Sequence, residues 1–157
     1  MTKHLTNKLT SILSLLFLAL TATAQIHHPQ NKTYMKSNTI KLTLEGGKTF
    51  TATLVDNSST RALVELLAKG DITIDMEDYA QMEKVGALGT SLPRNDRQTT
   101  TGPGDLILYL GKHFVIYYDT NSWNFTRLGK IDNASQADLK AALGKGDVTV
   151  TLSLDKE

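Results

Sequence analysis

The chain has 157 residues, of which 40% are hydrophobic, and its formal net charge at pH 7 is +1. This length favours a single domain once any targeting segment has been removed. The sequence contains no Cys, which excludes disulfides, Cys-based metal sites and a lipid-modified Cys. The near-neutral charge gives no electrostatic reason to expect nucleic acid or an anionic membrane as a partner.

Residues 1–24 have the pattern of a secretory signal peptide. Lys3 and Lys8 make the start basic, Ile12 to Leu20 form a short apolar run, and Ala22-Thr23-Ala24 supplies small residues for cleavage before Gln25. Because spanning a bilayer needs about 20 apolar residues, this run is too short for a comfortable membrane anchor. We therefore predict an exported protein, periplasmic or secreted, that keeps no membrane attachment after cleavage.

Residues 25–38 contain Pro29, many polar side chains and no periodicity, so we expect a flexible lead before a domain covering residues 39–157. Two strands with one buried face each are predicted at the start of that domain. Their inward residues are Ile40, Leu42, Leu44, Phe50, Ala52 and Leu54. Gly46-Gly47 between them is typical of a two-residue hairpin turn.

A short helix is predicted after this hairpin, with Ser59 as its cap and Gly70 at its end. Ile72, Ile74 and Met76 then alternate with polar residues, which indicates a third strand. Residues 77–104 are rich in Gly and Pro, and we expect them to be the least regular part of the domain. A segment this long is more often functional than incidental.

The rest of the chain predicts four strands and a second short helix. Leu106 to Leu110 is a continuous apolar run, typical of a strand covered on both faces, and Phe114 to Tyr118 is its expected partner. Further strands are expected at 123–131 and 148–154. Ser135 and Asp138 have the spacing of a capping box. Many strands with two short helices favour a mainly β fold, a small closed barrel whose ends the helices cap.

This order of elements resembles that of the cyclophilins, and more closely that of the bacterial cyclophilin-like family, over about residues 39 to 155. The motifs that carry the resemblance are Tyr79 with Glu83-Lys84-Val85-Gly86, Ser91-Leu92-Pro93 with Asn95-Asp96, Pro103-Gly104-Asp105-Leu106, His113-Phe114-Val115-Ile116, and Thr126-Arg127-Leu128-Gly129-Lys130-Ile131-Asp132. The resemblance implies a cyclophilin-like barrel. It does not by itself imply an activity, because one fold can carry many functions.

Cyclophilins isomerise X-Pro bonds, whose rotation barrier is about 18–20 kcal/mol. The resemblance implies an apolar proline pocket and an Arg in a Phe-His-Arg strand, with its guanidinium near the prolyl nitrogen. The corresponding strand here, Ile72 to Glu77, is acidic and has no Arg. Phe125 lies near the place of the usual His, and Phe114-Val115 replaces a Phe-Phe pair. We therefore expect the standard isomerase site to be missing, and we assign no catalytic residue.

Our first hypothesis is a binding module that holds a peptide or small ligand in a cleft beside the barrel. The candidate ligand-binding residues are Tyr79, Glu83, Arg94, Asn95, Gln98, Trp123, Phe125 and Arg127. Trp123, Phe125 and Arg127 have a second interpretation, in which the two aromatic rings pack in the core and the Arg is solvated. A prolyl isomerase with a rearranged site and a structural subunit of a larger exported assembly are the alternative functions.

We predict no metal and no cofactor. Asp71, Asp75, Glu77 and Asp78 form an acidic cluster, but alternation places Asp71 and Asp75 on an outward face, where solvated acids are ordinary, and the spacing does not fit an EF-hand. His113 stands alone beside a turn, and we interpret it as a surface histidine, because a metal site needs several converging ligands.

Overall fold

A computed structural model describes residues 38–155 of the chain. The predicted signal peptide and nearly all of the predicted lead lie outside the described residues. Nine strands and two helices follow one another in the described part. They are β1 (Thr39–Leu44), β2 (Thr49–Leu54), α1 (Ser58–Leu67), β3 (Ile72–Tyr79), β4 (Glu83–Ala87), β5 (Arg97–Thr100), β6 (Asp105–Tyr109), β7 (His113–Tyr117), β8 (Ser122–Ile131), α2 (Gln136–Leu143) and β9 (Val148–Leu154).

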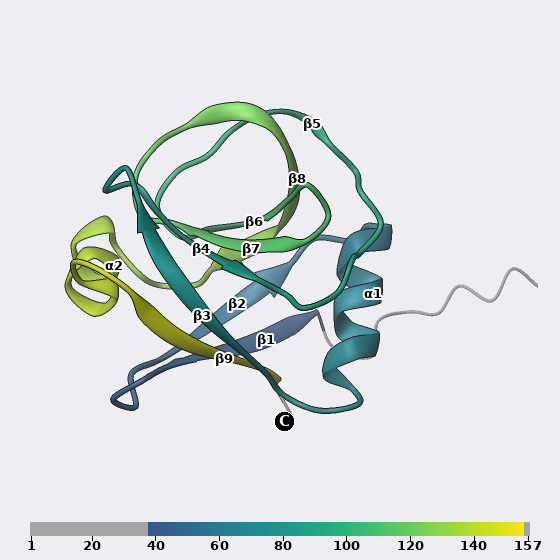
Figure 1. The fold of residues 1–157 in the computed structure, drawn as a ribbon, viewed down its shortest axis with the longest axis horizontal. Helices are drawn as coiled ribbons and strands as arrows, with labels where there is room; N and C mark the ends of the chain where they lie inside the picture. The colour runs from purple at the N-terminus through teal and green to yellow at the C-terminus, as the bar shows by residue number, and fades with distance from the viewer. Residues whose placement is uncertain (1–37, 156–157) are drawn as a thin grey trace, which may run out of the picture. The chain divides into compact units, whose positions relative to one another are not determined.

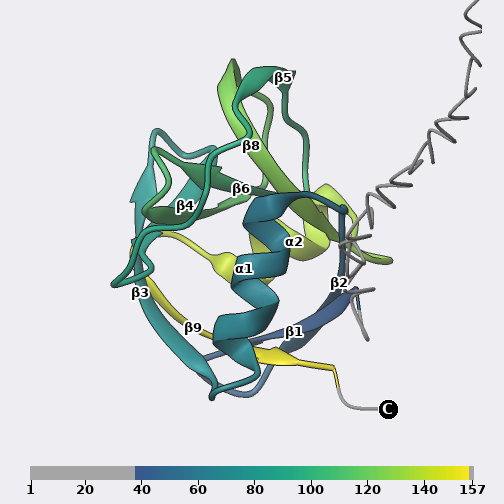
Figure 2. The ribbon, with the colours of Figure 1, turned by 90° about the vertical axis from the view of Figure 1, so that its right-hand side faces the viewer.

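The strands form a closed antiparallel barrel, as predicted. Their order is β2-β1-β9-β3-β4-β7-β6-β8, and pairing of β8 with β2 closes the ring (Figure 1). The ninth strand, β5, pairs with the first half of β8, and the two stand out from the barrel as a ribbon (Figure 2). Closure removes free sheet edges from the eight barrel strands.

Side chains of β1 point alternately into the barrel interior and towards its outer surface. Ile40, Leu42 and Leu44 of β1 are buried, and the residues between them are partly exposed. Gly46 and Gly47 both have positive φ, +96° and +92°, which explains the Gly-Gly pair in the turn. The alternating burial of β1 and the Gly46-Gly47 turn both agree with the prediction.

Gly129 allows β8 to approach β2 where the barrel closes. A Cβ atom at this position would lie 2.3 Å from the Thr53 carbonyl oxygen, a distance that no side chain tolerates. Gly129 opposes Leu54 of β2 on one side and Leu106 of β6 on the other. A residue without a side chain is therefore required at this point of the ring.

The two helices contribute to the same interior as the strands. Each helix buries two leucines in the main core: Leu63 and Leu67 from α1, Leu139 and Leu143 from α2. Figure 1 shows α1 and α2 on opposite sides of the barrel. The prediction that two short helices cap the ends is confirmed.

The predicted cap of α1 is wrong by two residues. Asn57 is the cap, and its side chain accepts a hydrogen bond of 2.9 Å from the backbone N–H of Thr60. The Ser59 hydroxyl instead donates to the Pro93 carbonyl oxygen. The cap of α2 is Ser135, paired with Asp138 as predicted.

The interpretation of residues 77–104 as irregular is also wrong in part. Glu77 to Tyr79 complete β3, and β4 and β5 both lie inside the segment. β4 shows no hydrophobic alternation because two of its buried residues, Glu83 and Lys84, are charged. Because of these turn residues and buried charges, β4 and β5 lack the apolar periodicity from which strands are predicted.

Candidate functional site

Strand β6 is buried on both faces, as its continuous apolar run predicted. Leu106 and Leu108 belong to the main core inside the barrel, whereas Ile107 belongs to a second cluster. This outer-face cluster consists of Ile107, Val115, Tyr117 and Phe125, with Met82, Val85 and Tyr109 packed against it. The same strands therefore support two apolar layers, one enclosed by the barrel and one on its outer surface.

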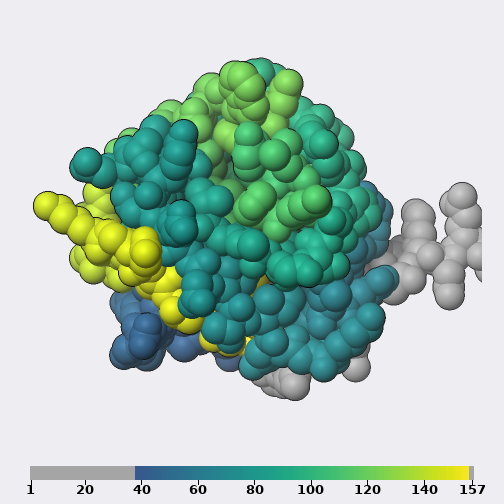
Figure 3. Space-filling model, viewed as in Figure 1, coloured from purple at the N-terminus to yellow at the C-terminus, as the bar shows by residue number. Residues whose placement is uncertain are grey.

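The outer-face cluster forms the floor of a cavity of about 640 Å³. We call this cavity the outer-face pocket. Figure 3 shows it as a hollow between atoms of β3–β4, in teal, and atoms of β8, in green. Its lining residues are Asp75, Glu77, Asp78, Tyr79, Glu83, Val85, Gly86, Ala87, Tyr109, His113, Val115, Tyr117, Asn121, Trp123 and Phe125.

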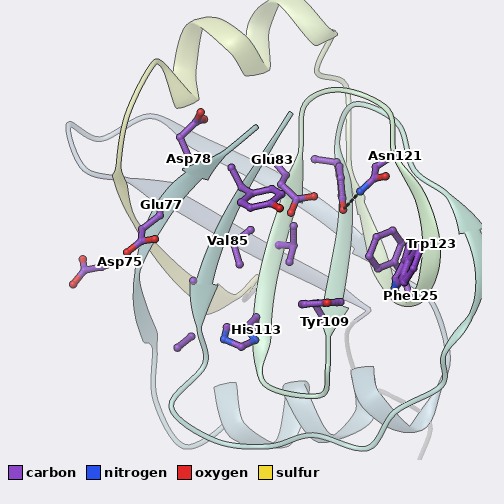
Figure 4. A pocket seen from close by; sticks show the side chains of 15 residues that line it. Asp75, Glu77, Asp78, Glu83, Val85, Tyr109, His113, Asn121, Trp123 and Phe125 are labelled. Atoms are coloured by element: carbon purple, nitrogen blue, oxygen red, sulfur yellow. Dashed lines mark hydrogen bonds between the residues drawn. The ribbon is translucent and has the colours of Figure 1, made fainter. Parts of the chain in front are cut away.

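Aromatic rings make up much of the lining. The ring of Phe125 lies 6.2 Å from that of Tyr109 and 5.8 Å from that of Tyr117, so the three form one packed group. Trp123 lies beside Phe125 at the edge of the pocket (Figure 4), and 61% of its surface is exposed. Tyr79, on the β3 side, is 63% exposed. Large exposed aromatic side chains next to a cavity are typical of a ligand site rather than of a closed core.

Glu83 projects into the pocket from β4 (Figure 4). It directly opposes Tyr117 of β7, and the Tyr117 hydroxyl accepts from the Asn121 amide at 3.3 Å. Only 8% of Glu83 is exposed, and its Oε2 has no hydrogen-bond partner among the described residues. Burial raises the pKa of the Glu83 carboxyl, and the neighbouring Tyr117 hydroxyl opposes this rise.

Three further carboxyl groups lie along the β3 side of the pocket. Asp75 and Glu77 point away from the sheet at this edge, and the Thr149 hydroxyl donates to Asp75 at 2.8 Å. Asp78 points towards α2, where it accepts from the Lys84 ammonium at 2.6 Å and from the Tyr118 hydroxyl. The hydrogen bond from Lys84, followed by that from Tyr118, lowers the pKa of Asp78. Among the described lining residues there is no Lys or Arg.

His113, which we predicted to be a surface histidine, also lines the pocket. His113 is half-buried at the end of the pocket opposite Glu83 (Figure 4), and its ring lies 6.4 Å from that of Tyr109. Its Nδ1 is buried without a hydrogen-bond partner among residues 38–155. The side chain faces the pocket because His113 begins β7 in the same outward register as Val115 and Tyr117.

Comparison with known proteins agrees with this architecture. The sequence profile of the cyclophilin-like family matches residues 43–153. The chain belongs to the cyclophilin-like family. A similar solved structure is the solution structure of a hypothetical protein from Archaeoglobus fulgidus, with a TM-score of 0.54 and 12% sequence identity over 73% of this chain and 92% of the other. At this identity the likeness concerns the fold alone. No curated protein matches the chain.

In this cyclophilin-like chain, four of the eight predicted ligand-binding residues line one pocket. Tyr79 and Glu83 come from the β3–β4 hairpin, and Trp123 and Phe125 come from β8. Trp123 and Phe125 were interpreted either as ligand-binding residues or as rings packed in the core. Phe125 is buried and Trp123 is exposed, so each interpretation describes one of the two residues.

The other four predicted residues are not brought to the outer-face pocket. Asn95, Arg127 and part of Phe125 line a smaller hollow of about 300 Å³ beside α1. The amide of Asn95 donates to the Ser58 and Ser59 hydroxyls, each at 2.8 Å. Asn95 therefore ties the 88–96 segment to α1.

The three remaining cationic and polar candidates are engaged elsewhere or exposed. Arg127 forms an ion pair of 2.6 Å with Asp105, and Arg94 pairs with Asp96. Gln98 is exposed on β5 and lines neither cavity. The single cleft expected from the sequence is thus divided: Trp123 lines the outer-face pocket, Arg127 lines the smaller hollow, and Phe125 contributes to both.

Within residues 38–155, no three His, Asp or Glu side chains converge as a metal site would require. No helix in this part of the chain has the length and apolar character needed to cross a membrane.

Proposed function

We propose that this cyclophilin-like chain is an exported binding module, and that a small molecule or a peptide side chain occupies the outer-face pocket. The observation that carries the proposal is a 640 Å³ cavity with an apolar floor and the exposed Trp123 at its edge. Cavities of about 300–1,000 Å³ with apolar walls and a few polar groups are typical of ligand sites. Glu83, Tyr117 and Asn121 supply such polar groups here.

Prolyl isomerisation is not part of this proposal. Isomerase chemistry needs a cation at the prolyl nitrogen, and the described lining of the pocket holds carboxyl groups and one imidazole instead. Arg127 pairs with Asp105 and lines the smaller hollow instead. A protease-coupled proline-peptide assay should give the uncatalysed rate. A clearly faster rate would favour a rearranged isomerase site.

Ligand binding can be tested with three probes that share a phenyl ring and differ in the charge of the tail: 2-phenylethylamine, 2-phenylethanol and 3-phenylpropanoate. Trp123 is the only Trp of the chain, so its fluorescence reports directly on the pocket. We expect at least one probe to change this emission saturably and to shift the amide NMR signals of Val115 and Phe125. No response to any of them up to their solubility would contradict the proposal.

Two Ala variants separate binding in the pocket from binding elsewhere. Trp123→Ala removes the ring at the pocket edge, and we expect it to weaken binding in NMR titrations. Val55→Ala is the matched control, because Val55 is also an exposed hydrophobic residue but lies outside the outer-face pocket. Equal losses in the two variants would show that the probes bind nonspecifically to apolar surface.

Export is a separate part of the proposal, and it rests on the sequence of residues 1–24. We expect the protein recovered from a secreting host to begin at Gln25. Mass spectrometry of the intact protein tests this, and a recovered chain that keeps Met1 would contradict it.

A further inference from the structure

We infer that the outer-face pocket selects a protonated amine carried on an apolar body, and that the Glu83 carboxylate receives that amine. The inference rests on the proposed function, because it names the class of ligand for the same pocket. Three observations support it: an unpartnered buried carboxyl oxygen, a described lining without Lys or Arg, and a set of aromatic rings.

The first observation is the incomplete hydrogen bonding of Glu83. A buried carboxyl group that lacks a partner for one oxygen destabilises the protein, and does so more strongly when it is charged. Its terminal torsion is broad, so a small rotation presents either oxygen to the pocket. Tyr117 is the cross-strand neighbour of Glu83, and it can stay in place while a ligand donates to the unpartnered oxygen. An ammonium group has three donors and a positive charge, which suits this acceptor best.

The second observation is the sign of the charges around Glu83. Asp75 and Glu77 add negative charge along the β3 edge, whereas the described lining has no Lys or Arg. Lys84 is fully buried on the other face of β4, where it pairs with Asp78. Its charge is therefore directed to Asp78 rather than to the pocket. A cavity lined by charges of one sign attracts ligands of the opposite sign and disfavours anions.

The third observation is the arrangement of aromatic rings. Tyr109, Tyr117, Trp123 and Phe125 surround the apolar floor, and Tyr79 stands on the opposite side beside Glu83. The face of an aromatic ring attracts a cation, and this attraction grows when water is excluded. The same rings offer apolar surface to the body of the ligand. Together they favour an amine attached to a ring or an alkyl chain over a free ammonium ion.

The three phenyl probes also test this inference, because the protonated amine, the neutral alcohol and the anion have nearly the same shape. We expect 2-phenylethylamine to bind about tenfold tighter than 2-phenylethanol, since a hydrogen bond to a charged group is stronger than a neutral one. We expect 3-phenylpropanoate to bind most weakly. Trp123 fluorescence measures all three affinities in the same wild-type protein.

Glu83→Gln identifies the receiving group, because Gln has the same shape and no charge. We expect this variant to lose most of the tenfold preference for the amine, with little change in affinity for the alcohol. Glu65→Gln, on the exposed surface of α1, is the matched control and should bind like wild type. Melting temperatures of both variants establish that they are folded. Tyr117→Phe should reduce amine binding less than Glu83→Gln does, because it leaves the carboxylate in place.

The possible failures are distinguishable. If the alcohol binds as well as the amine, or if Glu83→Gln keeps the preference, the inference about charge is overturned and the binding module still stands. If no probe binds, both fail. A capped Ala-Lys-Ala peptide and its Ala-norleucine-Ala counterpart separate the two sources of an amine. Binding of only the Lys peptide would assign the pocket to a peptide side chain, and binding of only 2-phenylethylamine would assign it to a small amine.

Discussion

The interior of the barrel and its outer-face pocket are built from the same strands, yet they differ in how completely they are filled. Inside, Leu106, Leu108 and Phe114 are fully buried, and both helices add leucines to the same cluster. Outside, Ile107 and Val115 are just as buried, but the layer above them is incomplete and leaves the pocket. The filled interior stabilises the fold, whereas the outer face leaves the space in which we propose that a ligand binds.

The two regions also differ in their polar groups. The buried ammonium of Lys84, at the end of the barrel near α2, is fully used: it donates to Asp78 and to the carbonyl oxygens of Gly144 and Gly146. The buried carboxyl group of Glu83, next to it in sequence, keeps one oxygen without a partner. These two neighbouring residues of β4 point to opposite faces of the sheet and differ in how completely they are hydrogen-bonded. The Lys84 ammonium, with all its partners, stabilises the barrel, whereas the Glu83 carboxyl group is the one that we propose to receive a ligand.

The largest expected effect tests the two faces through adjacent residues of β7. Phe114→Ala should lower the free energy of unfolding by about 3–5 kcal/mol, because it leaves a cavity in the closed interior. Val115→Ala should lower it by only about 1–2 kcal/mol, because fewer atoms are lost and the pocket side can relax. Urea unfolding of both variants measures the difference. Equal losses would contradict the distinction between the faces.

The next effect concerns the satisfied pair at the end of the barrel. Asp78→Ala should destabilise the protein by about 3 kcal/mol, because the fully buried Lys84 ammonium loses its carboxylate. The lowered pKa of Asp78 gives the wild type a pH dependence of defined sign. The contribution of Asp78 is present above its ordinary pKa of 3.8 and is lost as the pH falls through the lowered value. Urea unfolding at neutral and acid pH should show this loss in the wild type and not in the variant.

A smaller effect of opposite sign is expected at Glu83. Because burial raises the pKa of this carboxyl, its contribution to stability is present below the ordinary value of 4.5 and is lost as the pH rises through the raised value. Glu83→Gln should therefore raise the stability of the ligand-free protein by about 1 kcal/mol at neutral pH, and by less in acid. Thermal unfolding across this pH range measures the difference. A variant less stable than wild type at neutral pH would mean that the carboxylate is already satisfied without a ligand.

The pH dependence of amine binding should follow the same group. The titratable groups around Glu83 are Tyr117 on β7, Tyr79 and Asp78 on β3, and His113 at the other end of the pocket. Affinity for 2-phenylethylamine should rise with pH as Glu83 loses its proton. Glu83→Gln should abolish this rise, whereas a rise that persists in the variant would point to another titrating group.

The smallest expected effect on stability is that of Trp123→Ala. The side chain is 61% exposed, so its loss should change the free energy of unfolding by no more than about 0.5 kcal/mol. A thermal unfolding curve checks this directly. A loss as large as that of Phe114→Ala would place Trp123 in a structural role and weaken the case for the pocket.

The amino-acid sequence by itself determined the barrel, because period-two alternation in β1, β2, β3 and β9 marks one buried face without reference to any neighbour. The apolar run of β6 likewise predicted a strand covered on both sides, and the Ser135–Asp138 pair predicted α2. These signals are local: each depends on residues a few positions apart. Family membership follows from the order of the same elements.

Only the tertiary structure decided the site. It brought Glu83 opposite Tyr117, and it placed His113 at the other end of the same pocket, although neither residue belongs to an apolar pattern. It also divided the predicted cleft, because Trp123 of β8 lines only the outer-face pocket and Arg127 lines only the smaller hollow. The physical reason is that a pocket is formed by side chains that meet across strands distant in sequence, and its shape depends on which gaps the packing leaves unfilled.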